Sequence, residues 1–327
     1  MAPPPRPSAN SGTAAWPCSI QRTHPPMDND ASATCPNKGP ACASCEMTCD
    51  QRLPQDGHIT VGRRILVMSG KGGVGKSSIA ANLAVWLTLQ DYNVGLLDID
   101  IHGPSIPRLL GMDDVKLSQY DGLALPALFM GRLKVVSIGF MLSAPDTPVI
   151  WRGPAKHGVI EQFVRHVHWS ALDYLIVDCP PGTGDEMLSV AQVLGGGCEA
   201  LVVTTPQEVA LLDVKKCIAF CRRMAIPVRG IVENMSGFVC PHCGRTTDIF
   251  SHGGGEALAT ETGAPLLGCI PLDPQVAVCS DAGRPVVLSA PDSPTAQALM
   301  HAFRTLSVGT HPKKPQGDPY EDCHPTV

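Results

Sequence analysis

The sequence predicts an α/β protein with a doubly wound, mainly parallel β-sheet. Three observations predict it: a complete glycine-rich phosphate loop between a strand and a helix, buried strands that end in acidic residues, and helical segments between those strands. Strands that alternate with helices are typical of a parallel sheet whose two faces are both covered by helices.

The phosphate loop lies between a predicted strand at residues 65–69 and a predicted helix at residues 76–90. It fits G-x-x-x-x-G-K-[ST], in which backbone N–H groups surround phosphate oxygens, Lys76 reaches the β- and γ-phosphates and Ser77 coordinates Mg²⁺. The alternative, an ordinary glycine-rich turn, does not explain the complete motif. The predicted nucleotide-binding residues of this loop are Gly70, Lys71, Gly72, Gly73, Val74, Gly75, Lys76, Ser77 and Ser78.

Acidic residues follow two further predicted strands. The strand at residues 94–97 ends in Asp98 and Asp100, and the strand at residues 174–177 ends in Asp178. Carboxylates at the carboxyl ends of strands beside a phosphate loop suit Mg²⁺ and an attacking water. We expect Asp100 to orient the water, Asp98 to hold a metal-bound water and Asp178 to support Mg²⁺. The alternative is that these acids only belong to turns.

The remaining segments continue the alternation of strands and helices. Asn234 follows the last parallel strand, where its amide could pair with an adenine edge. The loop at residues 180–185 is expected opposite the γ-phosphate, where it could change shape when that phosphate leaves. The other predicted strands are 133–138, 201–204 and 228–232, and the other predicted helices lie near 159–167, 209–224, from 253 onward, and 294–307.

The chain contains 14 cysteines, and the residues around them predict metal binding. With a phosphate loop and no secretory signal, thiolate ligands are a better explanation than disulfides. A dense group near the N-terminus suits zinc or an iron–sulfur cluster, with loose free thiols as the alternative and Cys18 as an outlying candidate. Its members are Cys35, Cys42, Cys45 and Cys49.

A second C-x-x-C motif is formed by Cys240 and Cys243. Two thiols do not complete a metal site, so we consider three completions: the N-terminal cysteines, His242, or a second copy of the chain. Thiol exchange is a weaker interpretation, because the motif lacks a thioredoxin-like context. Four other cysteines are expected to pack in or near the core: Cys217, Cys221, Cys269 and Cys279.

Composition bounds the organisation of the 327-residue chain. We expect a disordered tail at 1–34, a cysteine segment and linker at 35–61, a nucleotide domain at 62–308 and a disordered tail at 309–327. The net charge of −5 and the pI near 6.1 argue against a general nucleic-acid or membrane binder. The sequence also suggests neither a signal peptide nor a membrane-spanning run.

Lys71, directly after the first glycine of the loop, gives K-G-G-V-G-K-S. This resembles the deviant Walker A signature of the SIMIBI class of P-loop NTPases, which includes ParA, MinD, nitrogenase iron protein and Mrp. With LLDIDIHGPSIPRLLG, VIWRGPAKHGVIEQF, YLIVDCPPGTGDE and VENMSGFVCPHC, residues 62–305 resemble the Mrp/Nbp family of cytosolic iron–sulfur cluster assembly factors. The N-terminal cysteines resemble those of its larger eukaryotic paralogue.

The resemblance implies an ATPase that assembles [4Fe–4S] clusters and transfers them to cytosolic and nuclear apoproteins. It implies a cytoplasmic homodimer, or a heterocomplex with a shorter paralogue, in which Lys71 reaches the partner's nucleotide. One cluster would bridge two chains through Cys240 and Cys243, and a second would bind the N-terminal cysteines. The N-terminal spacing is narrower here than in the family, since Cys35 lies seven residues before Cys42 and Cys49 four after Cys45.

Two other functions are compatible with the same fold. One is a MinD/ParA-like positioning switch whose cysteines hold structural zinc. Such proteins use a C-terminal amphipathic helix or a basic DNA surface, and residues 309–327 have neither pattern. The other is an electron-transferring reductase like nitrogenase iron protein, which would need a cluster that cycles stably between redox states.

Overall fold

The structure is a computed structural model that describes residues 60–101, 103–120, 122–141, 153–240 and 242–307. The two predicted tails, the N-terminal cysteine cluster and Cys18 lie outside the described residues. The predictions for these segments therefore stay predictions. The nucleotide domain lies almost wholly within the described residues.

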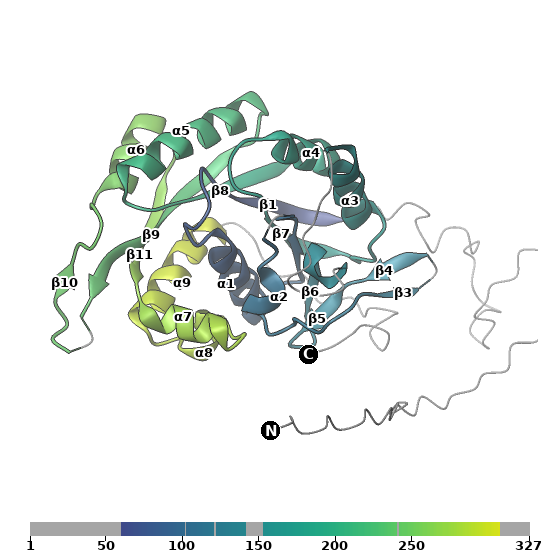
Figure 1. The fold of residues 1–327 in the computed structure, drawn as a ribbon, viewed down its shortest axis with the longest axis horizontal. Helices are drawn as coiled ribbons and strands as arrows, with labels where there is room; N and C mark the ends of the chain where they lie inside the picture. Colours follow the sequence, from purple (N-terminus) through teal and green to yellow (C-terminus); the bar gives the residue numbers. More distant parts are fainter. Residues whose placement is uncertain (1–59, 102, 121, 142–152, 241, 308–327) are drawn as a thin grey trace, which may run out of the picture. The chain divides into compact units, whose positions relative to one another are not determined.

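In the described part of the chain, nine strands form one sheet in the order β10-β9-β8-β1-β7-β2-β6-β5, with β11 also paired to β9 (Figure 1). All pairs are parallel except β5 with β6 and β10 with β9. The strands are β1 Val61–Ser69, β2 Val94–Asp98, β5 Ala127–Phe129, β6 Leu133–Ser137, β7 Leu172–Asp178, β8 Cys198–Thr204, β9 Val228–Val239, β10 Thr246–Thr247 and β11 Leu266–Leu272. The mainly parallel, doubly wound sheet is therefore confirmed.

Helices cover both faces of the sheet (Figure 1). One face carries α1, α2, α7, α8 and α9, and the other carries α3, α4, α5 and α6. The helices are α1 Lys76–Leu89, α2 Ile106–Leu109, α3 Gly153–Arg165, α4 Asp185–Leu194, α5 Glu208–Arg223, α6 Gly254–Thr262, α7 Pro274–Asp281, α8 Val286–Ser289 and α9 Pro294–Ser307. The predicted helices correspond to α1, α3, α5, α6 and α9.

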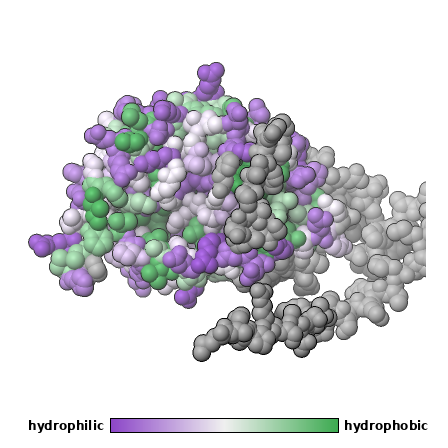
Figure 2. All heavy atoms as spheres, viewed as in Figure 1, coloured by the Kyte–Doolittle hydropathy of each residue, from purple (hydrophilic) through white to green (hydrophobic). Residues whose placement is uncertain are grey.

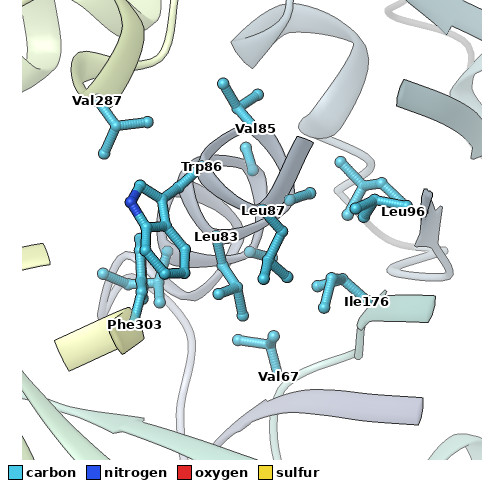
Figure 3. Close-up of a cluster of buried hydrophobic side chains, with 14 of the residues drawn as sticks. Val67, Leu83, Val85, Trp86, Leu87, Leu96, Ile176, Val287 and Phe303 are labelled. Carbon is cyan, nitrogen blue, oxygen red and sulfur yellow. The ribbon is translucent and has the colours of Figure 1, made fainter. Parts of the chain in front are cut away.

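The two faces of β1 belong to two separate hydrophobic clusters. Val67 packs with α1 residues, and Leu66 packs in the cluster on the opposite face. Figure 3 shows Val67 and Ile176 of the sheet beneath α1, with Trp86 of α1 against Phe303 of α9. Because the strands are buried on both faces, they are continuous apolar runs, and this is why the sequence predicts them well.

Four short strands of the described residues were not predicted from the sequence. β3 Ser118–Tyr120 and β4 Leu123–Leu125 pair as an antiparallel hairpin, and β5 adds an antiparallel edge to β6. The strand predicted to end before Asn234 instead continues to Val239, and β10 pairs back onto its end. The prediction of where this strand ends was wrong, and the correction matters because the strand continues as far as the second C-x-x-C motif.

The visible surface of the described residues mixes hydrophilic and hydrophobic side chains (Figure 2). The most exposed large apolar residues include Val209 and Leu212 on α5 and Val278 on α7. Among the described helices, none combines the length and apolar character needed to cross a bilayer.

Candidate functional site: the phosphate loop and the cysteine hairpin

The phosphate loop joins β1 to α1, as predicted, and two of its glycines are required by close packing. A Cβ atom on Gly70 would lie 2.4 Å from the backbone of Asp213 in α5. Gly75 adopts a φ of +84°, and a Cβ there would lie 2.3 Å from Nδ2 of Asn234. Larger residues at these positions would displace α5 or the Asn234 side chain, so the glycines fix the loop against both.

Lys76 begins α1 and points into a group of buried carboxylates. Its Nζ donates a hydrogen bond to Oδ1 of Asp178 at 2.5 Å and lies 3.7 Å from Oδ2 of Asp100. Burial lowers the pKa of Lys76, but the Asp178 and Asp100 carboxylates together outweigh burial and raise it, so the lysine stays charged. The structure thus brings together three of the four residues predicted to carry the catalysis.

Asp178 has the features of an Mg²⁺-supporting carboxylate. It is fully buried, and within the described part of the chain its Oδ2 atom has no hydrogen-bond partner. The Ser77 hydroxyl lies beside the same carboxylate, since it accepts a hydrogen bond at 3.3 Å from the Lys76 Nζ that also contacts Asp178. A hydroxyl and a carboxylate are the oxygen ligands that Mg²⁺ prefers, so Ser77 and Asp178 fit this ion.

Asp98 is held differently from Asp100. It has no exposed surface, and it accepts hydrogen bonds from the Ser137 hydroxyl at 2.8 Å and from the N–H groups of Asp100 at 3.1 Å and Ile106 at 3.3 Å. Burial, followed by the Asp178 carboxylate, raises the pKa of Asp98 to about 8. These contacts make Asp98 an anchor for the loop between β2 and α2. Ser137 was not identified from sequence, because it ends a strand without a motif.

Lys71 contacts its own chain in this structure. Its Nζ donates a hydrogen bond to Oε1 of Gln207 at 3.0 Å, just before α5 begins. The Ser69 hydroxyl donates to the Lys71 carbonyl at 2.9 Å, which folds the first part of the loop. Gln207 lies 136 residues from Lys71, and nothing in the local sequence around it indicated this contact.

The loop at residues 180–185 lies beside the phosphate loop, since the N–H of Gly182 donates to the Ser69 carbonyl at 2.9 Å. The loop leads directly into α4. There Glu186 accepts a hydrogen bond from Lys156 of α3. The loop is thus fixed to β1 at its centre and to a neighbouring helix at its end.

Asn234 touches the phosphate loop rather than standing apart from it. Its Nδ2 donates a hydrogen bond to the Val74 carbonyl at 2.9 Å. The adjacent residue, Glu233, is buried and contacts both Ser236 and Gly255. The predicted pairing of Asn234 with adenine stays a prediction, and Glu233 was not singled out from the sequence.

Cys240 and Cys243 lie in the hairpin between β9 and β10, which extends away from the body of the domain in Figure 1. The turn is closed by hydrogen bonds from the Cys240 N–H to the Arg245 carbonyl at 3.0 Å and from the Gly244 N–H to the Cys240 carbonyl at 2.8 Å. Cys243 is exposed, and hydrogen bonds from Arg245 and then Cys240 lower the pKa of its thiol. Lower pKa favours the thiolate that binds soft metals.

The described residues contain no group of three or more His, Cys, Asp or Glu side chains arranged to hold a metal ion. Completion of the Cys240–Cys243 pair by His242 therefore finds no support there. The other two completions stay predictions, because they involve residues outside the description or a second chain.

The remaining described cysteines divide into buried and exposed residues. Cys217 and Cys221 are buried on one face of α5, as predicted, and Cys279 is buried in the core. The prediction that Cys269 packs in or near the core was wrong, because its side chain is exposed. It lies on β11, which pairs with β9 outside the main strand order.

Comparisons with known proteins agree with this geometry. A ParA family model, described as NUBPL iron-transfer P-loop NTPase, matches residues 60–307. A cytosolic Fe-S cluster assembly factor Nubp2 homolog from Anopheles gambiae is 49% identical over 248 residues, covering 75% of this chain and 96% of that protein. An iron-sulfur cluster carrier protein from Methanocaldococcus jannaschii is 46% identical over 260 residues, covering 78% of this chain and 88% of that protein.

Solved structures are similar as well. A nucleotide-binding protein from Archaeoglobus fulgidus, in complex with ADP, has a TM-score of 0.62 and 41% identity, and the match covers 69% of this chain and 88% of that one. The cell division protein MinD from Aquifex aeolicus has a TM-score of 0.56 and 22% identity, covering 77% of this chain and all of that one. The second similarity shows the fold alone.

Proposed function

Since this chain belongs to the ParA-type family of NUBPL iron-transfer P-loop NTPases, we propose that it is an ATP-hydrolysing scaffold that assembles [4Fe–4S] clusters and delivers them to cytosolic and nuclear apoproteins. The observation that carries the proposal is the combination of two features in one domain. A complete phosphate loop contacts buried carboxylates, and a pair of thiols, of which Cys243 is exposed, lies on a projecting hairpin.

Nucleotide binding is assigned to the loop and its neighbours. The loop N–H groups and Lys76 hold the phosphates, and Ser77 and Asp178 hold Mg²⁺, which neutralises phosphate charge when bound. Asp100, 3.7 Å from the Lys76 ammonium, positions the attacking water. Lys71 acts on the nucleotide of a partner chain, for which it exchanges its contact with Gln207.

The cluster is cargo held by thiolates. Cys240 and Cys243 from each of two chains supply four thiolates, the number that a [4Fe–4S] cluster takes. The exposure of Cys243 and the lowered pKa of its thiol support this role. The partner is a second copy or a shorter paralogue. Cys35, Cys42, Cys45 and Cys49, outside the described residues, hold a second cluster. The cytosol is the proposed location, as the mosquito relative's name gives for that protein.

The test compares two cysteine variants after anaerobic reconstitution. The Cys240→Ala/Cys243→Ala protein is expected to lose the transferable iron and sulfide and to stop activating an apoenzyme that requires a [4Fe–4S] cluster. The matched control is Cys323→Ala, which removes a thiol that the proposal gives no role and is expected to transfer normally. Unchanged transfer by the double variant would reject the scaffold function.

A further inference from the structure

Strand β9 runs from the phosphate loop to the cysteine hairpin. At Asn234 it contacts the loop, through the 2.9 Å hydrogen bond to the Val74 carbonyl and through the close packing against Gly75. The same strand ends at Val239, immediately before Cys240. One strand therefore contacts the nucleotide loop and also carries the first cysteine of the proposed cluster site.

The strand is bent between these two points by a bulge. Asn234 pairs with Ile270 of β11, and the next pair joins Phe238 with Leu272, so three residues of β9 lie opposite one residue of β11. Within the bulge Met235 has a φ of +58°, which is unusual for a residue with a side chain. Bulges change the direction of a strand, so this one sets where the hairpin points.

Glu233 holds the bulge and the returning chain together. Its side chain is 1% exposed. One carboxylate oxygen accepts from the Ser236 hydroxyl at 2.6 Å, inside the bulge, and the other accepts from the Gly255 N–H at 2.5 Å, in the first turn of α6. Because α6 begins where the chain comes back from the hairpin, this one buried carboxylate fixes both ends of the hairpin. A negative charge at a helix N-terminus is also favourable.

We propose that Glu233, Asn234 and Ser236 couple the phosphate loop to the cysteine hairpin, so that nucleotide binding changes the accessibility of Cys240 and Cys243. The peptide of Val74 belongs to the loop that surrounds the phosphates. A shift of its carbonyl acts on Asn234, and the adjacent Glu233 passes that shift to the bulge and to α6. The inference rests on the proposed function for the identity of the two sites.

This coupling has a thermodynamic consequence. If bound nucleotide changes the affinity of Cys240 and Cys243 for a ligand by some factor, that bound ligand changes the affinity for nucleotide by the same factor. The three residues are positioning residues, since each acts through the backbone of β9 and not by contact with cargo. The loop at 180–185 also lies beside the phosphate loop, through its contact with Ser69 of β1, but it is Asn234 that lies on the strand leading to the cysteines.

The test measures thiol alkylation in the full-length protein. N-ethylmaleimide labelling of the peptide that contains Cys240 and Cys243 is followed by mass spectrometry, with and without saturating Mg²⁺ and a non-hydrolysable ATP analogue. We expect nucleotide to change the wild-type labelling rate about fivefold, because one hydrogen bond contributes about 1 kcal/mol and that free energy corresponds to about a fivefold ratio. No nucleotide-dependent change in wild type would overturn the inference.

Variants then locate the coupling. Ser236→Ala removes the hydroxyl that Glu233 holds, and it is expected to reduce the rate ratio to about one while nucleotide affinity stays at the wild-type value. Thr260→Ala removes an exposed hydroxyl of α6 that donates a hydrogen bond to the Glu256 carbonyl, and it should keep the wild-type ratio. A purely structural role for Ser236 would change labelling equally with and without nucleotide, and that result would also overturn the inference.

The same experiment separates this inference from the proposed function. Labelling requires no iron, so a failed coupling leaves the result of the cluster-transfer test standing. Conversely, if nucleotide changes thiol accessibility but the protein transfers no cluster, the inference is supported and the scaffold function is rejected.

Discussion

Asp98 supplies the sharpest prediction, because a buried carboxyl beside the nucleotide site should be protonated at neutral pH. Burial and the Asp178 carboxylate raise its pKa from 3.8 to about 8. The Asp98→Asn variant keeps the shape of the side chain and removes the titration. A neutral group there removes the repulsion between Asp98 and the Asp178 carboxylate, which Lys76 already pairs.

The magnitude follows from proton linkage. Because the folded-state pKa of Asp98 lies above the value of 3.8 in the unfolded chain, the native protein binds more protons between these two values. The free energy of unfolding therefore falls as pH rises through this window, by at most about 1.4 kcal/mol per pH unit. Between about pH 5.5 and about pH 7.5 the wild type should lose on the order of 2–3 kcal/mol that Asp98→Asn does not lose.

Urea denaturation of both proteins at several pH values, followed by tryptophan fluorescence, measures this difference. The matched control is Asp91→Asn, since Asp91 is exposed and its ion pair with Arg132 lies at the surface. The control profile should run parallel to wild type within about 0.5 kcal/mol. Parallel profiles for Asp98→Asn and wild type would refute the assignment of a protonated Asp98.

Three further predictions concern charged contacts. Lys71→Ala should reduce steady-state ATP hydrolysis, measured as phosphate release, while leaving the free energy of unfolding nearly unchanged. Phosphate release at the wild-type rate would show that Lys71 has no role in the site of a partner chain. Lys76→Met leaves the buried Asp178 carboxylate unpaired, so it should destabilise the nucleotide-free protein by about 3–5 kcal/mol in urea denaturation at neutral pH. A free energy of unfolding for Lys76→Met equal to that of the wild type at that pH would contradict this prediction. Glu199→Gln weakens the contacts of Glu199 with Arg63 and Arg229, and it should lower the free energy of unfolding by about 1–2 kcal/mol at pH 7. Because these arginines lower the pKa of Glu199, the cost should shrink as pH falls below 4.5, and a cost that stays constant would contradict this.

The parts of the fold that the sequence predicted are those with strong local signals. The strand, loop and helix around Lys76 have a complete motif, and the buried parallel strands are continuous apolar runs. The three-residue strands β3, β4 and β5 are too short to show a period, and the sequence did not reveal them. The continuation of β9 was missed because Gly237 and the cysteines after it are typical of a loop, whereas pairing with β10 and β11 keeps the segment extended.

In the candidate site too, contacts within a sequence motif were predicted and contacts between residues distant in sequence were not. Lys76, Asp100 and Asp178 meet as the motif predicted, because the carboxyl ends of adjacent parallel strands lie at one edge of the sheet. The partners of Asp98 and Lys71 come from residues distant in sequence, and no local pattern reports such contacts. The burial of Glu233 could not be predicted from the sequence either, since it depends on where α6 packs after the hairpin.

The central claim is that two chains share one cluster through Cys240 and Cys243. Its most direct test is an anaerobic count of iron, sulfide and zinc in a variant whose four N-terminal cysteines are replaced by serine, together with its mass in solution. Sharing predicts a dimer with about two iron and two sulfide atoms per chain and no zinc. A monomer that keeps its full metal content at these two cysteines, or a dimer that holds zinc and no iron, would contradict the claim.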